Sequence, residues 1–425
     1  MAMAIETPKP GFRLGMLIYD TRFRAITIQI IVLILFLLFV AWLADNTRHN
    51  LALKGKDIDF SFLWRRAGYD IGQHLIPYSN DSTHGAAAIV GLLNTLVVAV
   101  LGCVFSTALG VVFGVLRLSK NWIVARLMTV YIEMFRNVPL LLWIILVYVI
   151  LGETMPTTQD YKKSFALVAD GKEPTTSMLF DNSVAVTNQS INLPAPQLAR
   201  SLGSLDLGVI SLNLTFLAIV AVIIASYLVN RRLRAQARMV QEATGVRPPT
   251  WWKSPLILIL PIALVLWLCG LNFSFPEFGK FNFSGGISIP HPFTALMAAL
   301  SLYYAAVTAE IVRSGIQAIN RGQSEAAYAL GLRPGRTMNL VILPQALRVI
   351  IPPMISQWLS LTKDTSLGIA VSYLDLRGTL GGITLNQTGR ELECMLLMML
   401  IYLIISLIIS SVANAYNASV KLKER

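Results

Sequence analysis

The chain has 425 residues, of which 55% are apolar and only 14% are charged, and its formal net charge is +12. A soluble globular domain carries about 25% charged residues, so this composition excludes an ordinary soluble protein and favours a chain that resides in a lipid bilayer. A net charge this positive also occurs in nucleic-acid-binding proteins. The positions of the basic residues therefore have to decide between a membrane protein and a nucleic-acid-binding protein.

Long apolar runs predict membrane-spanning helices, because about 20 apolar residues are needed to cross a hydrocarbon core of roughly 30 Å. Solid runs such as 26–43 are not the ten-residue alternating segments of a transmembrane β-barrel. The predicted fold class is therefore all-α, a polytopic transmembrane helical bundle with about eight spans. In chain order, the spans are predicted at 25–43, 88–116, 128–151, 208–229, 255–271, 293–312, 339–361 and 394–414.

The distribution of charge orients this bundle. An even number of spans places both termini on one side, and most of the 35 lysine and arginine residues lie in the segments on that side. Most of the acidic residues lie in the loops on the other side. The positive-inside rule then predicts that both termini are cytoplasmic. It also explains the net charge without nucleic acid. The long polar segment 152–207 lies outside and is expected to form a small extracytoplasmic cap.

The cytoplasmic loop 313–338 has an ordered pattern of helix signals. Ser324 is the expected N-cap of a short helix, and Glu325 follows in the first turn, where the helix dipole favours an anion. Ala326 and Ala327 give the helix a slim surface, and Gly331 permits a left-handed end. Such a helix is well shaped to fit a groove on a partner and to transmit a push. From the local pattern alone, an ordinary connection between two helices remains the alternative.

The complete spacing is more specific. Glu325-Ala326-Ala327, three residues, Gly331, nine residues and then Val341-x-Leu343-Pro344 resembles the EAA signature of ABC-importer permeases, with Val341 where that family usually has isoleucine. The resemblance implies a coupling helix, within residues 324–335, that docks on a separate ATPase. The residues to which it assigns ATPase coupling are Glu325, Ala326, Ala327, Gly331, Leu332 and Pro344.

Further segments resemble the polar amino acid branch of these permeases. They are Gly91-Leu-Leu-Asn-Thr95, the stretches 131–141 and 309–317, and Leu361-Thr-Lys363-Asp364-Thr-Ser-Leu367. The resemblance implies a type I ABC-importer-like five-helix core, enlarged as in the larger permease subunits of general L-amino acid transporters. The implied organisation is 1–87 for the N-terminal tail, first span and extracytoplasmic segment, 88–151 for the first part of the core, 152–292 for the insertion with two additional spans, and 293–425 for the second part of the core.

The resemblance implies a function and a set of partners. The chain is expected to be the permease subunit of an ATP-driven importer for polar L-amino acids in the bacterial inner membrane. Its implied partners are ABC ATPase subunits, a second homologous permease and a periplasmic amino-acid-binding protein, with the lipid bilayer around it. No P-loop motif occurs, so ATP and Mg are expected on the partner ATPase, and this chain is expected to hold no cofactor, metal or catalytic residue. A secondary amino acid transporter and a membrane channel or scaffold are the alternatives.

Two sets of polar residues are candidates for the substrate pathway. Glu310 and Arg313 are three apart near the inner part of the sixth span, so they share a helix face and can form a pair. At the expected outer end of the seventh span, charges and hydroxyls that a zwitterion can use are offered by Lys363, Asp364, Thr365 and Ser366. Ionisable groups at membrane depth usually face a bundle interior or water. Structural pairing and charged helix ends are the alternatives.

Overall fold

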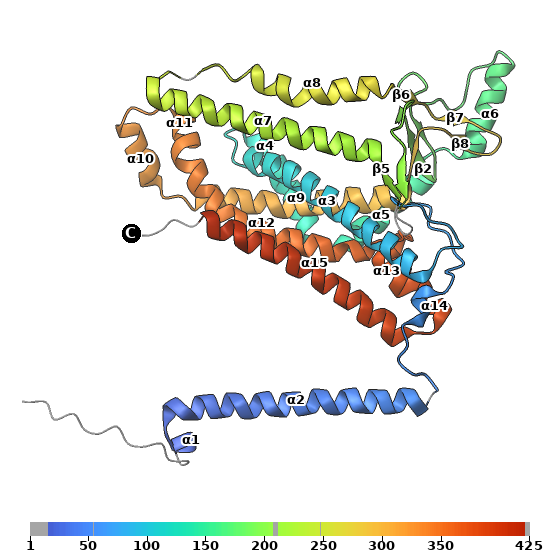
Figure 1. Ribbon diagram of the computed structural model, residues 1–425. Helices are drawn as coiled ribbons and strands as arrows, with labels where there is room; N and C mark the ends of the chain where they lie inside the picture. Colours follow the sequence, from blue (N-terminus) through green and yellow to red (C-terminus); the bar gives the residue numbers. More distant parts are fainter. Residues whose placement is uncertain (1–15, 54, 207–210, 247, 421–425) are drawn as a thin grey trace, which may run out of the picture.

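The computed structural model describes residues 16–53, 55–206, 211–246 and 248–420, and it shows a bundle of long helices with a small cap at one end (Figure 1). Within these residues, seven helical stretches are long and apolar enough to cross a membrane, and α8 (Lys253–Leu268) is a shorter apolar helix. The predicted helical bundle is therefore confirmed. Positions 208–210 of the predicted span 208–229 lie outside the described residues, and α7 (Leu214–Thr244) begins after them.

One helix forms the centre of the bundle. In α9 (His291–Gln317), 67% of the most apolar window is buried, compared with at most 28% in the other spans. Its neighbours are α3 (His84–Arg117), α4 (Trp122–Asn137), α5 (Leu140–Thr154) and α12 (Leu343–Asp364). The other long helices are α2 (Thr21–Leu53), α3 (His84–Arg117), α5 (Leu140–Thr154), α12 (Leu343–Asp364) and α15 (Glu391–Val420). The shorter helices are α1 (Met16–Tyr19), α4 (Trp122–Asn137), α6 (Thr158–Ala169), α10 (Arg321–Ala329), α11 (Pro334–Thr337), α13 (Leu376–Gly378) and α14 (Leu385–Thr388). Four short segments between these helices have other helical geometries. The 3₁₀ segments are η1 (Ser61–Trp64) and η3 (Thr365–Val371), and the π-helical segments are η2 (Met338–Ile342) and η4 (Thr379–Thr384).

The predicted third span 128–151 is wrong as a single helix. The structure divides it into α4 and α5, which are separated by Val138 and Pro139. Proline has no N–H for the helix ladder, and its ring disfavours the helical conformation in the residue before it. Val138 is accordingly extended, with φ −106° and ψ 133°.

The cap combines two parts of the chain. Its strands are β1 (Ala185–Val186), β2 (Ser190–Leu193), β3 (Ala195–Leu198), β4 (Ser204–Asp206), β5 (Ser211–Asn213), β6 (Leu271–Ser274), β7 (Glu277–Phe278), β8 (Phe283–Ser284) and β9 (Ile287–Pro290). β2 pairs antiparallel with β1 and β9, and β3 pairs antiparallel with β6. The cap therefore includes the connection between α8 and α9 as well as the predicted segment 152–207. The short strands were not predicted, and they add a β part to a molecule that was expected to be all-α.

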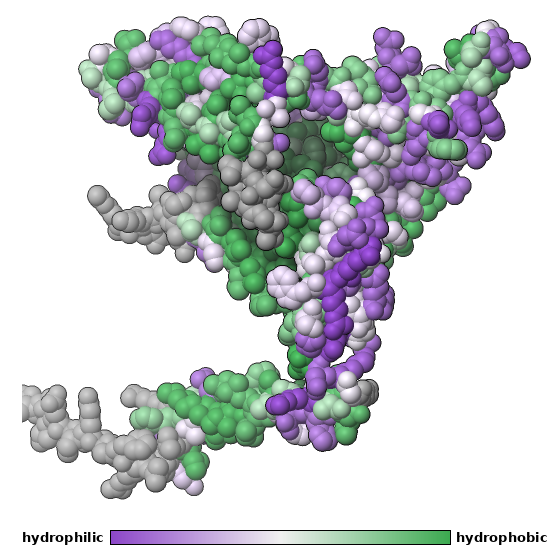
Figure 2. Space-filling model, turned by 45° about the vertical axis from the view of Figure 1, so that its right-hand side comes forward, coloured by the Kyte–Doolittle hydropathy of each residue, from purple (hydrophilic) through white to green (hydrophobic). Residues whose placement is uncertain are grey.

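The first span stands apart from the bundle. None of the most apolar window of α2 is buried, and its surface is apolar over most of its length (Figure 2). The segment after α2 is hydrogen-bonded to the start of α15. The Lys56 Nζ donates to the Gly389 carbonyl at 3.2 Å, and the Asp59 N–H donates to Glu393 Oε1 at 3.2 Å. These contacts tie the segment that follows α2 to the start of α15, and the sides of α2 remain free for lipid or another chain.

Candidate functional site

The predicted coupling segment is a short helix at the end of the bundle opposite the cap (Figure 1). Helix α10 begins after Asn320, whose Oδ1 accepts the Gly322 N–H at 2.9 Å. The prediction that Ser324 is the N-cap is therefore wrong, because the helix starts one turn earlier. Both residue types are good caps, and the sequence alone did not decide between them.

The exposed face of α10 carries both charge and apolar surface. Glu325 and Ala326 are exposed, whereas Ala327 is only 4% exposed and faces the molecule. Tyr328 is 50% exposed and Leu330 is 82% exposed. Neither residue was predicted to have a role, although a large apolar side chain in an otherwise polar loop is a signal that could have indicated both. Exposed apolar side chains that lie together mark surfaces that a partner can cover, and tyrosine is enriched among the residues that carry binding energy in such surfaces.

The chain turns back immediately after α10. Gly331 has φ +78°, a conformation that side-chain-bearing residues rarely adopt, as the sequence predicted. The Leu332 N–H then donates to the Ala327 carbonyl at 3.1 Å, and the Leu332 side chain is half-buried. Pro344 is exposed near the start of α12. Of the six residues with an expected coupling role, Glu325, Ala326, Gly331 and Pro344 are exposed. Ala327 and Leu332 instead support the helix from behind.

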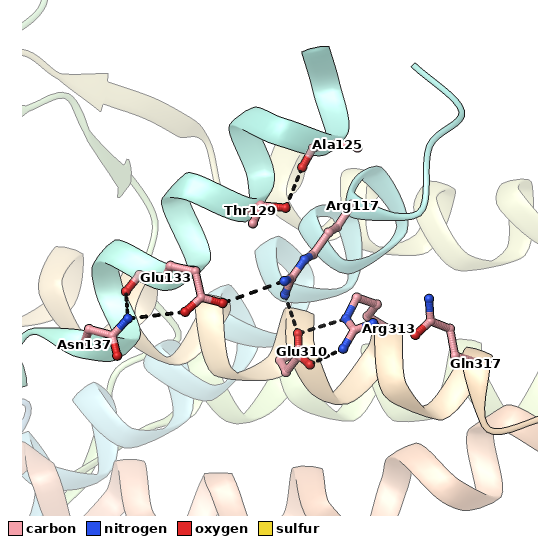
Figure 3. Close-up of polar contacts among 8 residues, drawn as sticks. All are labelled: Arg117, Ala125, Thr129, Glu133, Asn137, Glu310, Arg313 and Gln317. Atoms are coloured by element: carbon pink, nitrogen blue, oxygen red, sulfur yellow. Dashed lines mark hydrogen bonds and ion pairs between the residues drawn. The ribbon is translucent and has the colours of Figure 1, made fainter. Parts of the chain in front are cut away.

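A cluster of charges lies where α3, α4 and α9 meet (Figure 3). Glu310 forms ion pairs with Arg117 and Arg313, and the Arg313 Nε donates to Glu310 Oε2 at 3.0 Å. Arg117 also lies 3.8 Å from the carboxylate of Glu133. The exposed side-chain fractions are 15% for Arg117, 24% for Glu310 and 27% for Arg313. The i, i+3 pair expected from the sequence is present, but Arg117 and Glu133 come from other helices and no local pattern indicated them.

The second set lies deeper than expected. The Tyr304 hydroxyl donates to Asp364 Oδ2 at 2.7 Å, and Tyr304 is the central residue of α9. Lys363 and Asp364 are the last two residues of α12, as predicted, but this end of α12 lies beside the middle of α9 and not at the end of the bundle. The chain continues outward as the 3₁₀ segment η3, with Thr365 buried and Ser366 half-buried, while Lys363 is exposed.

The two sets are not brought together into one site. Glu310 follows Tyr304 by six residues on α9, which corresponds to about 9 Å along the helix axis. The candidate residues therefore occupy two successive levels, one beside the middle of α9 and one nearer to α10. Among the described residues, no group of three or more His, Cys, Asp or Glu side chains is arranged to hold a metal ion.

Comparison with known proteins decides the family. The family model described as "Binding-protein-dependent transport system inner membrane component" matches residues 106–422, which include both candidate sites. The chain belongs to this family. It is thus a multi-pass membrane permease component, and the confirmed helical bundle agrees with that assignment.

Several relatives match 95% or more of the chain. A protein from Rhodobacter capsulatus named as a glutamate/glutamine/aspartate/asparagine transport system permease is 65% identical over 100% of both chains. A general L-amino acid transport system permease from Rhizobium johnstonii is 40% identical over 98% of this chain and 96% of its own. A putative amino-acid ABC transporter permease from Escherichia coli is 38% identical over 95% of each chain. A solved structure titled "Crystal structure of an amino acid ABC transporter with histidines" covers 79% of this chain and 95% of its own, at 18% identity and a TM-score of 0.44.

Proposed function

We propose that the protein is the permease subunit of an ATP-driven ABC importer for polar L-amino acids. The observation that carries this proposal is the position of α10, a short helix with an exposed Glu325, Tyr328 and Leu330 at the end of a family-matched bundle. The names of the relatives that match its full length support the substrate class. The chain forms the translocation path together with a second permease, and ATP and Mg bind to partner ATPase subunits.

The proposed orientation in the inner membrane follows from charge. Most basic residues lie on the side of α10, so the positive-inside rule makes that side cytoplasmic, together with both termini. The ATPase then docks on α10. The cap is extracytoplasmic, where a periplasmic amino-acid-binding protein delivers the substrate. The described ends of the chain, in α1 and α15, lie on the same side of the bundle as α10 in Figure 1, which is consistent with this orientation.

The proposed substrate path runs past the two levels of polar residues on α9 and α12. A zwitterionic amino acid needs a cation for its carboxylate and an anion for its ammonium group. Lys363 and Asp364 provide both at the middle of the bundle, with the Ser366 hydroxyl nearby in sequence. Transporters commonly bind substrate at this depth, and charged residues in a membrane protein usually face the interior or water. Glu310 and Arg313 line the next level toward the cytoplasm.

The docking role of α10 is tested with Leu330→Asp, and with Val246→Asp as a matched control. Both side chains are exposed and apolar, at 82% and 71%, and both lie at the proposed cytoplasmic end, but Val246 is in the turn after α7. Complexes are purified from detergent-solubilised native membranes, and co-purified ATPase and ATP hydrolysis are measured. Loss of a central docking residue typically costs 2 kcal/mol or more, so Leu330→Asp should reduce bound ATPase by about tenfold or more.

The control should retain the ATPase. Equal amounts of ATPase on wild type and Leu330→Asp would contradict docking through α10. If the purified chain alone took up amino acids on an ion gradient in liposomes, the importer proposal itself would be wrong and a secondary transporter would replace it.

A further inference from the structure

The cytoplasmic end of the α7–α8 pair carries an unusual concentration of positive charge. Arg231, Arg232, Arg234 and Arg238 are all exposed on the last part of α7, and Lys253 begins α8. None of these five cations has an ion-pair partner among the described residues, and Glu242, one turn beyond Arg238, forms no ion pair with them. Neither the proposed substrate path nor α10 uses this surface.

Three of the arginines share one side of α7. At 3.6 residues per turn, Arg231, Arg234 and Arg238 fall within about a sixth of the helix circumference. This side borders α8, because the Arg234 Nε donates to the Ser254 Oγ at 3.4 Å and α7 packs along α8 (Figure 1). Asn230, one turn before Arg234 on the same side, is 5% exposed, and its Oδ1 has no hydrogen-bond partner among the described residues.

The turn also has the features of a membrane–water interface. Trp251 and Trp252 are 80% and 48% exposed just before α8, and the Lys253 Nζ lies 5.4 Å from the centre of the Trp252 ring. Tryptophan is enriched at the level of lipid headgroups. α8 has 16 residues, which corresponds to about 24 Å, less than the roughly 30 Å of a bilayer core. A short helix is accommodated by local thinning, which brings headgroups toward its ends.

We propose that the α7–α8 turn binds the headgroup of an anionic phospholipid of the cytoplasmic leaflet. The phosphate contacts Arg231, Arg234 and Arg238, whose exposed side chains lie on one side of α7. Clusters of arginine and lysine next to the cytoplasmic end of a span attract anionic lipids, and each residue strengthens the attraction. The cytoplasmic placement rests on the orientation proposed above. The lipid fixes the turn of a helix pair that the five-helix core does not contain.

The test compares wild type with an R231Q/R234Q/R238Q variant and with a charge-matched K120Q/R126Q/R348Q control. The control removes three exposed cations from separate places at the same end of the bundle. Each full-length protein is delipidated in detergent, titrated with phosphatidylglycerol, phosphatidylcholine or inorganic phosphate, and analysed by native mass spectrometry. Size-exclusion chromatography first establishes that all three proteins are folded.

Wild type and the scattered control should retain phosphatidylglycerol at least about tenfold better than phosphatidylcholine, and the clustered variant should lose this preference. Competition by inorganic phosphate at equal concentration would identify a site for free phosphate and overturn the lipid proposal. An equal loss in both triple variants would mean that only total charge matters, which also overturns it. If the clustered variant retained lipid but no longer co-purified the ATPase, the surface would belong to the ATPase interface. The Leu330→Asp result does not depend on these outcomes, so this proposal and the importer proposal can fail separately.

Discussion

Replacing Gly110 by alanine tests how closely α3 and α9 depend on each other. A Cβ atom at Gly110 would lie 2.5 Å from the Thr308 Cβ and 2.9 Å from the Ala305 carbonyl oxygen. Four residues later, a Cβ at Gly114 would lie 2.7 Å from the Ala309 carbonyl oxygen. Small residues four apart allow two membrane helices to approach at backbone distance. Because backbone atoms cannot move aside as a flexible side chain does, the alanine has to push the helices apart.

The magnitude follows from two opposing effects. Forcing an extra methyl group into a packed interface costs about 1–3 kcal/mol, and the contact with the backbone places Gly110→Ala near the upper end. Exchanging glycine for alanine within a helix contributes about 1 kcal/mol in the other direction. Gly152 on α5 provides the matched control, because it is also helical and a Cβ there meets nothing within 4 Å. The difference between the two variants isolates the packing cost, about 3 kcal/mol.

The assay is thermal unfolding of the purified chain in detergent, together with amino acid uptake by the reconstituted complex. For a chain of this length, a difference of about 3 kcal/mol corresponds to a difference in Tm of about 3 °C. Gly152→Ala should unfold at or slightly above the wild-type temperature, and Gly110→Ala should unfold below it. If Gly110→Ala proved as stable as Gly152→Ala, the close approach of α3 and α9 would not exist in the membrane protein.

Three further predictions concern the candidate sites. Glu310→Gln should lower the free energy of unfolding by about 2 kcal/mol, because it leaves Arg117 and Arg313 without their shared carboxylate. In the same thermal assay, the double variant Glu310→Gln with Arg313→Gln should recover part of this loss. Lys363→Gln should raise the KM for amino acid uptake about tenfold at unchanged Tm, and an unchanged KM would remove Lys363 from the proposed path. Asn320→Ala should destabilise α10 by about 1 kcal/mol and weaken ATPase co-purification, because it removes the N-cap. Ser324→Ala should leave ATPase co-purification unchanged. If Ser324→Ala weakened co-purification and Asn320→Ala did not, Ser324 would be the cap.

The spans were predictable because their signal is local. About twenty consecutive apolar residues can cross a membrane as a helix wherever they lie in the fold. The left-handed conformation of Gly331 was predictable because few residues other than glycine adopt it. The division of the third span was also encoded, since Pro139 interrupts it, but the apolar pattern continues on both sides and conceals the break.

The depth and partners of the charged residues were not predictable in the same way. Glu310 pairs with Arg117, 193 residues away, and only the packing of α3 against α9 brings the two together. The depth of Asp364 depends on where α12 ends relative to α9, and the 3₁₀ segment that follows looks in sequence like a helix end at the membrane surface. The short cap strands pair segments on either side of the α7–α8 pair, so neither segment alone contained the signal.

The position of α10 in the chain connects the proposed docking surface to both levels of the path. Residues 318–320 join α10 to α9, and α9 carries Glu310 and Tyr304 on one continuous helix, so a displacement of α10 that moved α9 would reach both levels. On its other side α10 is joined to α12 through α11 and the π-helical segment η2, where the wider turn is less regular. The Tyr304 hydroxyl on α9 donates to Asp364 at the end of α12, so a movement of α9 relative to α12 would strain or break this hydrogen bond. If the proposed docking and path are correct, the Tyr304–Asp364 contact is where a push on α10 would change the environment of the substrate. Tyr304→Phe should then uncouple ATP hydrolysis from amino acid uptake while leaving the ATPase bound, and uptake still tightly coupled to hydrolysis in this variant would contradict the proposal.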